Sequence, residues 1–251
     1  MKKYSYWKNP VASQVTGNET DQVLVQERPA PPATKEELLY NACSLAGKTL
    51  GQVAHQLGIS IPENLQHKKG WQGQLIEKAL GGINSTFAGP DFPELGIELK
   101  TIPLDHRGLP KESTYICAIE LSDIYGQLWE TSLVYNKLKQ VLWVPVESEQ
   151  SIPVAKRHIG MPLLWSPNLK QEQLLKTDWE EHMEKISLGR IADITAHMGN
   201  ILQVRPKAAS GKIRRKGSNE EGETKDTLPR GFYLRPSFTS EILTQHFIHP
   251  A

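Results

Sequence analysis

The strand expected to decide the fold reads Leu95-Gly96-Ile97-Glu98-Leu99-Lys100. Apolar residues alternate here with other residues at the period of two that is typical of a β-strand. Leu95, Ile97 and Leu99 therefore share one face, and Glu98 and Lys100 share the other. The sequence predicts a strand with one face in the core and a carboxylate next to an ammonium group on the opposite face.

An aspartate completes a chemically useful pattern around this strand. Asp91 lies in the turn that leads into it, so the pattern is Asp-x6-Glu-x-Lys with Glu98 and Lys100. Two carboxylates, together with phosphate oxygens and waters, suit Mg²⁺, which prefers six oxygen ligands. A lysine beside them can orient a water nucleophile and stabilise charge that develops on phosphoryl oxygens. The pattern suits phosphodiester hydrolysis, but alternating charges are also typical of the solvated face of an edge strand.

Three short helices are expected before the strand. Thr34 begins the first with capping-box spacing to a glutamate three residues on, and glycines close the next two, over 49–57 and 70–80. Glu77 lies on the third helix. On its own, this residue also fits an ordinary solvated helix position.

The rest of the chain alternates between the two periodicities. Further strands are expected at 114–121, 141–146, 200–205 and 231–234, and further helices at 131–139, 167–186 and 239–247. Such interleaving predicts an α/β (α+β) fold, a mixed central sheet flanked by helices. We expect a flexible tail at 1–33 and two lobes, 34–128 and 129–251, with Lys137 on a helix of the second lobe.

Composition excludes several classes of protein. The 251 residues carry a net charge of +1 and only two cysteines, which gives neither a disulfide framework nor a zinc site. No signal peptide, membrane-spanning stretch, nucleotide-binding loop, His-Glu-x-x-His pair or Gly-x-Ser-x-Gly elbow occurs. We expect a soluble cytoplasmic protein with no membrane association and no nucleotide cofactor.

A local basic segment lies within the near-neutral chain. Six cations and no acidic residue occur between 205 and 216, and they are Arg205, Lys207, Lys212, Arg214, Arg215 and Lys216. Phosphates are the natural partners of such a patch. A solvated surface loop is the alternative, because Glu220, Glu221 and Glu223 follow closely.

Several phrases occur in one order along the chain. They are Lys69-Gly70-Trp71, Leu75-Ile76-Glu77, Leu95 to Pro103, Trp129-Glu130-Thr131-Ser132, Lys137-Leu138-Lys139, Val141 to Glu147, Leu163 to Asn168, Arg205 to Ala209 and Leu228 to Leu234. In these phrases the chain resembles the MutH mismatch-repair endonucleases, which share the fold of type II restriction enzymes. The resemblance extends from about residue 34 to the C-terminus and fades between 210 and 227. It implies two lobes that form a DNA-binding cleft.

The resemblance assigns roles to the site residues position by position. It makes Asp91 and Glu98 ligands of Mg²⁺, for which Mn²⁺ would substitute, and it makes Lys100 the catalytic lysine. Glu77 joins them as a further metal ligand that supports the site. Lys137 matches an auxiliary catalytic lysine that completes the site from the second lobe.

The resemblance also implies how DNA is held. Lys69, Arg205, Lys207 and Tyr233 match positions at or near the DNA interface, and a basic DNA-facing loop with Lys212, Arg214 and Arg215 is expected from its charge. Tyr233 would approach the target adenine, where an N6-methyl group alters packing and removes one donor position. A buried strand tyrosine is the alternative for this residue.

The implied reaction is methylation-specific. The family nicks the unmethylated strand of double-stranded DNA at hemimethylated GATC sites, 5′ to the G, and also accepts unmethylated GATC. MutL, with MutS upstream, activates it. A single Asp-x6-Glu-x-Lys set per chain agrees with a monomer that cuts one strand.

Two other functions remain open from the sequence. The segment from Leu50 to Ser60 looks like the start of a helix-turn-helix, which would suggest a regulator that binds DNA without cutting it. A restriction enzyme that cuts both strands of GATC is the second alternative. It would need a dimer, because the chain contains no second Asp-x6-Glu-x-Lys pattern.

Overall fold

A computed structural model describes residues 29–66, 68, 70–82, 89–120, 126–207, 215–218 and 224–248, with the backbone alone at 215–218, 224–227 and 248. The chain divides into two compact units. Unit 1 consists of Met1–Lys111, Val141–Trp165 and His246–Ala251, and unit 2 consists of Glu112–Gln140 and Ser166–Gln245. This grouping differs from a single division near residue 128, because strands on either side of that residue pair with each other in both units.

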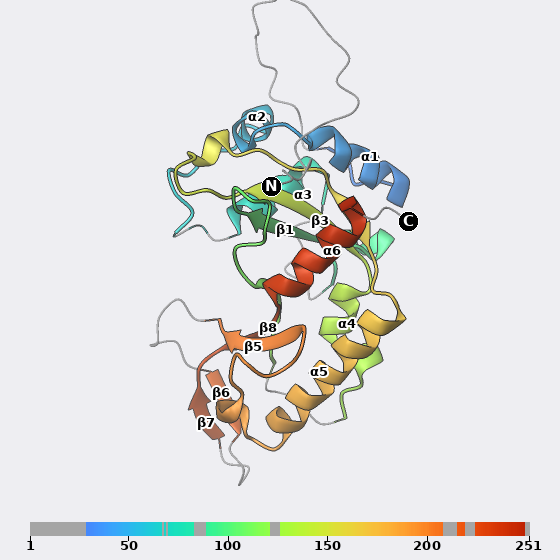
Figure 1. The fold of residues 1–251 in the computed structure, drawn as a ribbon, viewed down its shortest axis with the longest axis vertical. Coiled ribbons are helices and arrows are strands. Elements are labelled where there is room, and N and C mark those ends of the chain that lie inside the picture. Colours follow the sequence, from blue (N-terminus) through green and yellow to red (C-terminus); the bar gives the residue numbers. More distant parts are fainter. Residues whose placement is uncertain are drawn as a thin grey trace, which may run out of the picture. The chain divides into compact units, whose positions relative to one another are not determined.

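Unit 1 is built on a mixed sheet of three strands (Figure 1). The strands are β1 (Glu98–Leu104), β3 (Val141–Glu147) and β4 (Leu163–Trp165), in the order β1-β3-β4. β1 runs parallel to β3, with Glu98 opposite Val141, and β4 is antiparallel to β3. All residues of β3 but the last are buried, as expected of a central strand that is covered on both faces.

Three α-helices near the start of the described chain pack against the sheet of unit 1. They are α1 (Lys35–Leu45), α2 (Leu50–Gln56) and α3 (Trp71–Ala79). The side chains of Thr34 and Thr49 cap the first two by accepting backbone N–H bonds, as the capping-box spacing at Thr34 predicts.

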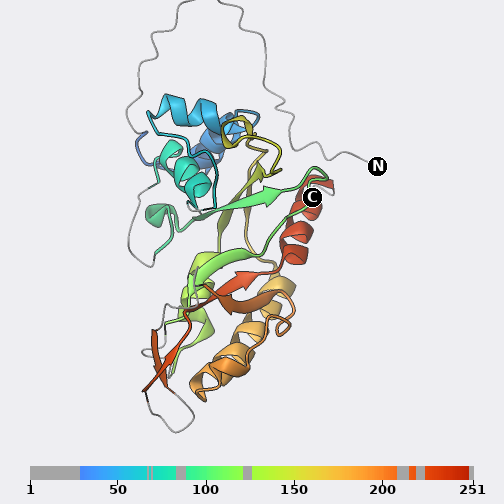
Figure 2. The ribbon, with the colours of Figure 1, turned by 90° about the vertical axis from the view of Figure 1, so that its left-hand side faces the viewer.

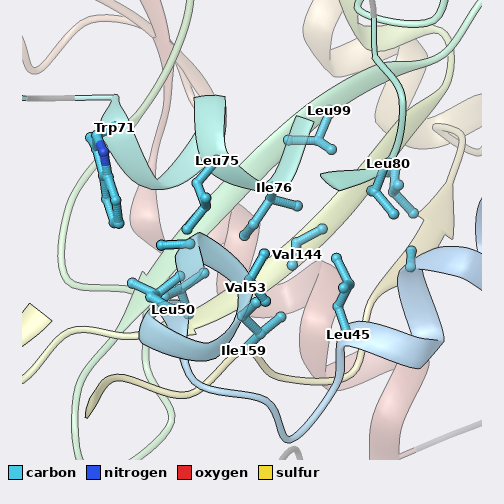
Figure 3. Packing of buried hydrophobic residues seen from close by; sticks show 14 of the residues in the cluster. Leu45, Leu50, Val53, Trp71, Leu75, Ile76, Leu80, Leu99, Val144 and Ile159 are labelled. Carbon is cyan, nitrogen blue, oxygen red and sulfur yellow. The ribbon is translucent and has the colours of Figure 1, made fainter. Parts of the chain in front are cut away.

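The core of unit 1 lies between these helices and the sheet. Figure 3 shows Leu75 and Ile76 of α3 above Val53 of α2, with Leu99 and Val144 contributed by β1 and β3. All five side chains are buried. Each fully buried aliphatic side chain contributes about 1.5–3 kcal/mol, so this cluster fixes α3 against β1.

Unit 2 is built on an antiparallel sheet of three strands with β8 in the centre. Its strands are β2 (Thr114–Ala118), β8 (Arg230–Leu234) and β5 (Leu202–Pro206), and a separate hairpin joins β6 (Arg215–Ser218) to β7 (Thr224–Thr227). The unit also contains α4 (Leu133–Leu138) and α5 (Leu169–Ser187), which runs alongside the sheet in Figure 2. α6 (Pro236–Ile248) follows β8, and its last residues belong to unit 1.

A buried carboxylate ties α5 to β5. Asp178 is fully buried, and its oxygens accept hydrogen bonds of 2.7–2.9 Å from the backbone N–H groups of Asn200, Ile201 and Leu202. The side-chain amide of Asn200 donates a further bond of 2.9 Å. A carboxylate with this many donors tolerates burial, so Asp178 is a structural anchor.

The α/β fold class is confirmed, with two corrections. The strand expected at 95–100 begins only at Glu98 and extends to Leu104, because Pro93–Leu95 form a 3₁₀ turn. The strands expected in one central sheet divide between two sheets. Strand β4 and the hairpin of β6 and β7 were not expected from periodicity. Along the part of the chain that the structure describes, no helix combines the length and the hydropathy of a membrane span.

Candidate active site

A tight loop carries Asp91 back to the start of β1. Phe92 and Ile97 exchange two backbone hydrogen bonds of 2.9 and 3.2 Å, and Gly96 turns the chain between them with a φ of 66°. Because this closes the loop, Asp91 lies beside the strand that follows it. Its Oδ2 accepts a 2.8 Å hydrogen bond from the backbone N–H of Leu99. Backbone geometry therefore fixes the aspartate next to Glu98 and Lys100.

Glu98 and Lys100 form an ion pair on one face of β1, in which the carboxylate is buried and the lysine is partly buried. The Nζ of Lys100 donates to Oε1 of Glu98 at 2.5 Å. Glu98 is 1 % exposed, and the side chain of Lys100 is 16 % exposed. A carboxylate at this depth is strongly disfavoured unless a cation accompanies it. The solvated-edge-strand interpretation of these two residues is therefore wrong.

Glu77 is also buried, on the last turns of α3. Only 8 % of its surface is exposed, because it follows core residues on a helix that packs on β1. On the same helix, a Cβ at Gly73 would lie 3.8 Å from Oγ1 of Thr101 on β1, which is an ordinary contact distance between packed elements. The alternative of an ordinary solvated helix position is wrong for Glu77. Its role in binding a metal stays a prediction.

The donor chemistry at the start of β1 fits a hard divalent cation. Asp91 and Glu98 offer carboxylate oxygens, which Mg²⁺ prefers, and a Mg²⁺ site needs only one or two carboxylates beside waters and substrate phosphate. Among the described residues, no three of the His, Cys, Asp and Glu side chains are grouped so that they could hold a metal ion.

The fifth expected catalytic residue, Lys137, belongs to the other unit. It is half-buried in the last turn of α4. The other four candidates, Glu77, Asp91, Glu98 and Lys100, lie in unit 1. Completion of the site by Lys137 stays a prediction.

One face of the unit 2 sheet joins the expected DNA-contacting residues to two tyrosines. In register, Tyr233 of β8 lies between Tyr115 of β2 and Gln203 of β5. The tyrosine rings meet edge to face with centroids 5.3 Å apart. The guanidinium of Arg205 lies 5.9 Å from the Tyr233 ring centroid, and Nζ of Lys207 donates to the Tyr115 hydroxyl at 2.6 Å. We call this set, with Ser113 added below, the tyrosine face.

A serine hydroxyl on the tyrosine face is shared by a glutamine and an arginine. The hydroxyl of Ser113 accepts from Nε2 of Gln203 at 2.7 Å and from the guanidinium of Arg205 at 3.0 Å. Burial, with a smaller contribution from Tyr115, raises the pKa of Tyr233, so its phenol stays protonated and able to donate. Tyr233 is half-buried on β8, so part of the side chain is accessible, and its part in DNA recognition stays a prediction.

Comparisons with known proteins show similarity over most of the chain. The model of the family described as "DNA mismatch repair enzyme MutH" matches residues 81–178. The DNA mismatch repair protein MutH of Escherichia coli O127:H6 is 51% identical over 227 residues, covering 90% of this chain and 99% of the relative. That of Shewanella baltica OS185 is 51% identical over 217 residues, covering 86% and 97%. The chain belongs to the MutH family.

Membership in the MutH mismatch-repair endonuclease family explains the architecture of unit 1. This family has the restriction-endonuclease-like fold, and the chain is an enzyme that acts on DNA. The segment matched by the family model includes Asp91, Glu98, Lys100 and Lys137. Identity at this level over nearly all of the chain supports the resemblance seen in the motifs.

Some expected contacts lie outside what the structure describes. Lys69, Lys212 and Arg214 are not among the described residues, and Arg215 begins β6. The MutH-family interpretation of these residues stays a prediction. The helix-turn-helix alternative loses its support, because Leu50 and Val53 of α2 are core residues and no helix is found at 59–66.

Sequence reasoning missed Tyr115, Ser113 and Gln203. Tyr115 lies in an expected strand, but only the antiparallel register with β8 brings it opposite Tyr233. Ser113 precedes that strand and meets a residue of β5 far along the chain. Periodicity predicts strands and not their partners, so the pairing signal was absent from a single sequence.

Proposed function

We propose that this protein is a Mg²⁺-dependent endonuclease of mismatch repair. It nicks the unmethylated strand at hemimethylated GATC sites, 5′ to the G, by hydrolysing a phosphodiester bond. The observation that carries the proposal is the geometry at the start of β1, where Asp91 is held at the N–H of Leu99 and Lys100 is paired with Glu98. Two hard oxygen donors and one lysine in a buried setting suit phosphodiester chemistry.

Each residue of the site has a distinct part in the proposed reaction. Asp91 and Glu98 would hold Mg²⁺, which when bound supplies positive charge that polarises the phosphoryl group and acidifies water. Glu77 would support this pair from α3. Lys100, held by Glu98, would orient the attacking water through its Nζ and stabilise the charge that builds on the phosphoryl oxygens.

Burial strengthens these interactions. Glu98 is almost inaccessible to water, and charges interact more strongly in such surroundings than in bulk solvent. The Lys100 ammonium is already placed by its hydrogen bond to Glu98, so little reorganisation is needed during the reaction. Lys137 is proposed as a second cation that acts on the same phosphate.

The tyrosine face of unit 2 suits the recognition of DNA. Arg205 and Lys207 are exposed, and cations on the phosphate backbone position a duplex, while contacts to base edges read its sequence. We assign the reading of the adenine to Tyr233, whose environment an N6-methyl group would change. Methylation of one strand then decides which strand is cut.

Regulation and assembly complete the proposal. With one catalytic set per chain, a monomer would cut one strand. MutL, with MutS upstream, would activate the enzyme in the cytoplasm, and any use of ATP would belong to the partner.

The test is cleavage of supercoiled plasmid in three states of GATC methylation. With Mg²⁺, hemimethylated plasmid should become a nicked circle, and unmethylated plasmid should also be cut. MutL should increase the rate of nicking. Fully methylated plasmid should stay intact, EDTA should stop the reaction, and Mn²⁺ should restore it. Linear plasmid as the first product would instead favour a restriction enzyme, and no metal-dependent cleavage of any plasmid would refute the proposal.

A further inference from the structure

The turn that ends α3 has the geometry of a Schellman motif. Leu80 is the C-cap, and Gly81 follows it with a φ of 73°. The backbone N–H of Gly81 donates to the carbonyl of Lys78 at 3.2 Å, and that of Gly82 donates to the carbonyl of Glu77 at 2.8 Å. These two bonds define the motif, and they place Glu77 in the last turn of the helix, directly beneath Gly82.

This motif is commonly accompanied by an apolar contact between those two positions. In this protein the two positions are occupied by Glu77, which carries a carboxylate, and by Gly82, which has no side chain. A Cβ on Gly82 would lie 2.5 Å from Cγ of Glu77 and 3.0 Å from the Glu77 carbonyl oxygen, and 3.4 Å from Cζ of Phe92. The space that a side chain would occupy is therefore filled by the Glu77 side chain on one side and by the Phe92 ring on the other.

The backbone of Gly82 does not itself require glycine. Its φ lies outside the left-handed region, unlike that of Gly81, so alanine would fit the backbone. The obstacle is the Cγ of Glu77, which is close to the helix backbone and not at the flexible end of its side chain. Cγ can move away only by a change of χ1, and a helix offers few χ1 rotamers. Such a change would swing the whole carboxylate to another place.

The same turn touches the loop of Asp91. Phe92 follows Asp91 directly, and its backbone bonds with Ile97 close the loop that brings Asp91 to Leu99. The Phe92 ring lies next to the position that a Gly82 side chain would take. The turn after α3 and the loop before β1 therefore come close together at Gly82, next to the Glu77 side chain.

We propose that Gly82 is a positioning residue of the nuclease site, because its missing side chain holds Glu77 in the rotamer that the reaction uses. The proposal rests on the proposed function, in which Glu77 supports the metal-binding pair. It predicts that a single methyl group at 82 disturbs catalysis mainly by displacing the Glu77 side chain, because the contact with Cγ of Glu77 is much shorter than the one with the Phe92 ring.

The first experiment compares Gly82→Ala with Gly73→Ala in the full chain. Gly82→Ala should lower the kcat of Mg²⁺-dependent nicking at least about tenfold, the size typical of residues that orient metal ligands, with DNA binding in Ca²⁺ unchanged. Gly73→Ala, on the same helix, is the control, because a Cβ there would make only an ordinary contact of 3.8 Å with Thr101 of β1. It should nick at the wild-type rate. Wild-type kcat for Gly82→Ala, or equal losses in both variants, would overturn the proposal.

The second experiment is a double-mutant cycle with Glu77→Ala, which removes the clashing Cγ. If Gly82 acts through Glu77, the variant with both changes should nick at the rate of Glu77→Ala alone. The Tm lost in Gly82→Ala should be largely regained in the double variant, a readout that needs no activity. Even if Gly82→Ala alone fails to fold, the double variant should fold and serve for the comparison.

The cycle separates failure of this proposal from failure of the function. Losses of kcat that multiply in the double variant, or a Tm loss that persists without Cγ, would show that Gly82 acts elsewhere. Full activity of Glu77→Ala would also refute the positioning role while nicking by the wild type upheld the function. Only a wild-type protein without Mg²⁺-dependent cleavage would remove both.

Discussion

Charged side chains at the start of β1 differ in exposure and in partners from those on the tyrosine face. At β1, Glu98 and Lys100 are withdrawn from water and paired, and Asp91 is tied to the backbone of Leu99. On the tyrosine face, Arg205 and Lys207 are exposed and lie against aromatic rings. Buried charges are few, rigid and little screened by salt, whereas exposed cations are adaptable and strongly screened. The first setting suits bond breaking, and the second suits holding a polyanion.

The largest expected effect comes from removing charged groups at the start of β1. Lys100→Ala and Asp91→Ala should each lower Mg²⁺-dependent nicking by about 100-fold or more, because Lys100 is proposed to act on the reacting phosphate and Asp91 to hold Mg²⁺. DNA binding measured in Ca²⁺ should change little. Lys156→Ala, at an exposed lysine of the same unit, is the matched control and should nick normally. Undiminished cleavage by either site variant would remove the basis of the comparison.

A buried carboxylate without a proposed chemical role sharpens the comparison. Asp178→Ala should destabilise the protein by about 3 kcal/mol, because three backbone N–H groups and an amide would lose their acceptor. Urea unfolding measures the loss, and Glu180→Ala on the exposed side of α5 is the control. At a temperature where both proteins are folded, Asp178→Ala should still nick. A stable variant without activity would show that burial alone does not distinguish structural from catalytic carboxylates here.

The exposed cations should produce intermediate effects that differ from each other. Arg205→Ala should weaken binding to GATC by about 1–3 kcal/mol and relax specificity, because Arg205 is fixed by Ser113 beside Tyr233. Lys207→Ala should weaken binding to all sequences and reduce the salt slope by about 1. Fluorescence anisotropy at several salt concentrations, on GATC and on scrambled duplexes, measures both. Identical sequence profiles for the two variants would contradict a division of roles.

The smallest effect concerns His182, which is buried on α5 in unit 2. Its Nε2 lies 3.1 Å from the carbonyl of Leu202, to which it must donate, and its Nδ1 has no hydrogen-bond partner among the residues that the structure describes. Burial lowers the pKa of His182, while the Leu202 bond and the charge of Asp178 oppose this shift and Arg235 adds to it. The imidazole of His182 therefore binds a proton more readily in the unfolded chain than in the folded protein. The free energy of unfolding should decrease as the pH falls below the pKa of an unfolded histidine, about 6.5.

Urea unfolding at several pH values tests this expectation. The wild-type midpoint should fall between pH 7.5 and pH 5.5, and His182→Gln, which keeps a donor but does not titrate, should show a smaller decrease. An equal decrease in both proteins would show that other groups cause it.

Local features of the fold could be predicted from the sequence, and pairings could not. Helix caps and the alternation at Glu98 and Lys100 depend on neighbouring residues, so they were readable. The burial of Glu98 was not, because it depends on distant parts of the chain, such as β3, that meet β1 only in the folded protein. The candidate residues of unit 1 were found because a family pattern names them, while Gly82 shows its importance only through the distance to Cγ of Glu77.

The parallel pairing of β1 with β3 has a consequence for the protein's synthesis. Glu98 reaches its place opposite Val141 only after α4 and the start of β3 have left the ribosome, and β3 gains its other neighbour only with β4. Pairings between distant segments form late, since loop closure must precede them. A nascent chain that ends near residue 128 carries every acidic candidate ligand but has no sheet to hold them. The acidic candidate ligands can therefore be held in place only after β3 has been translated.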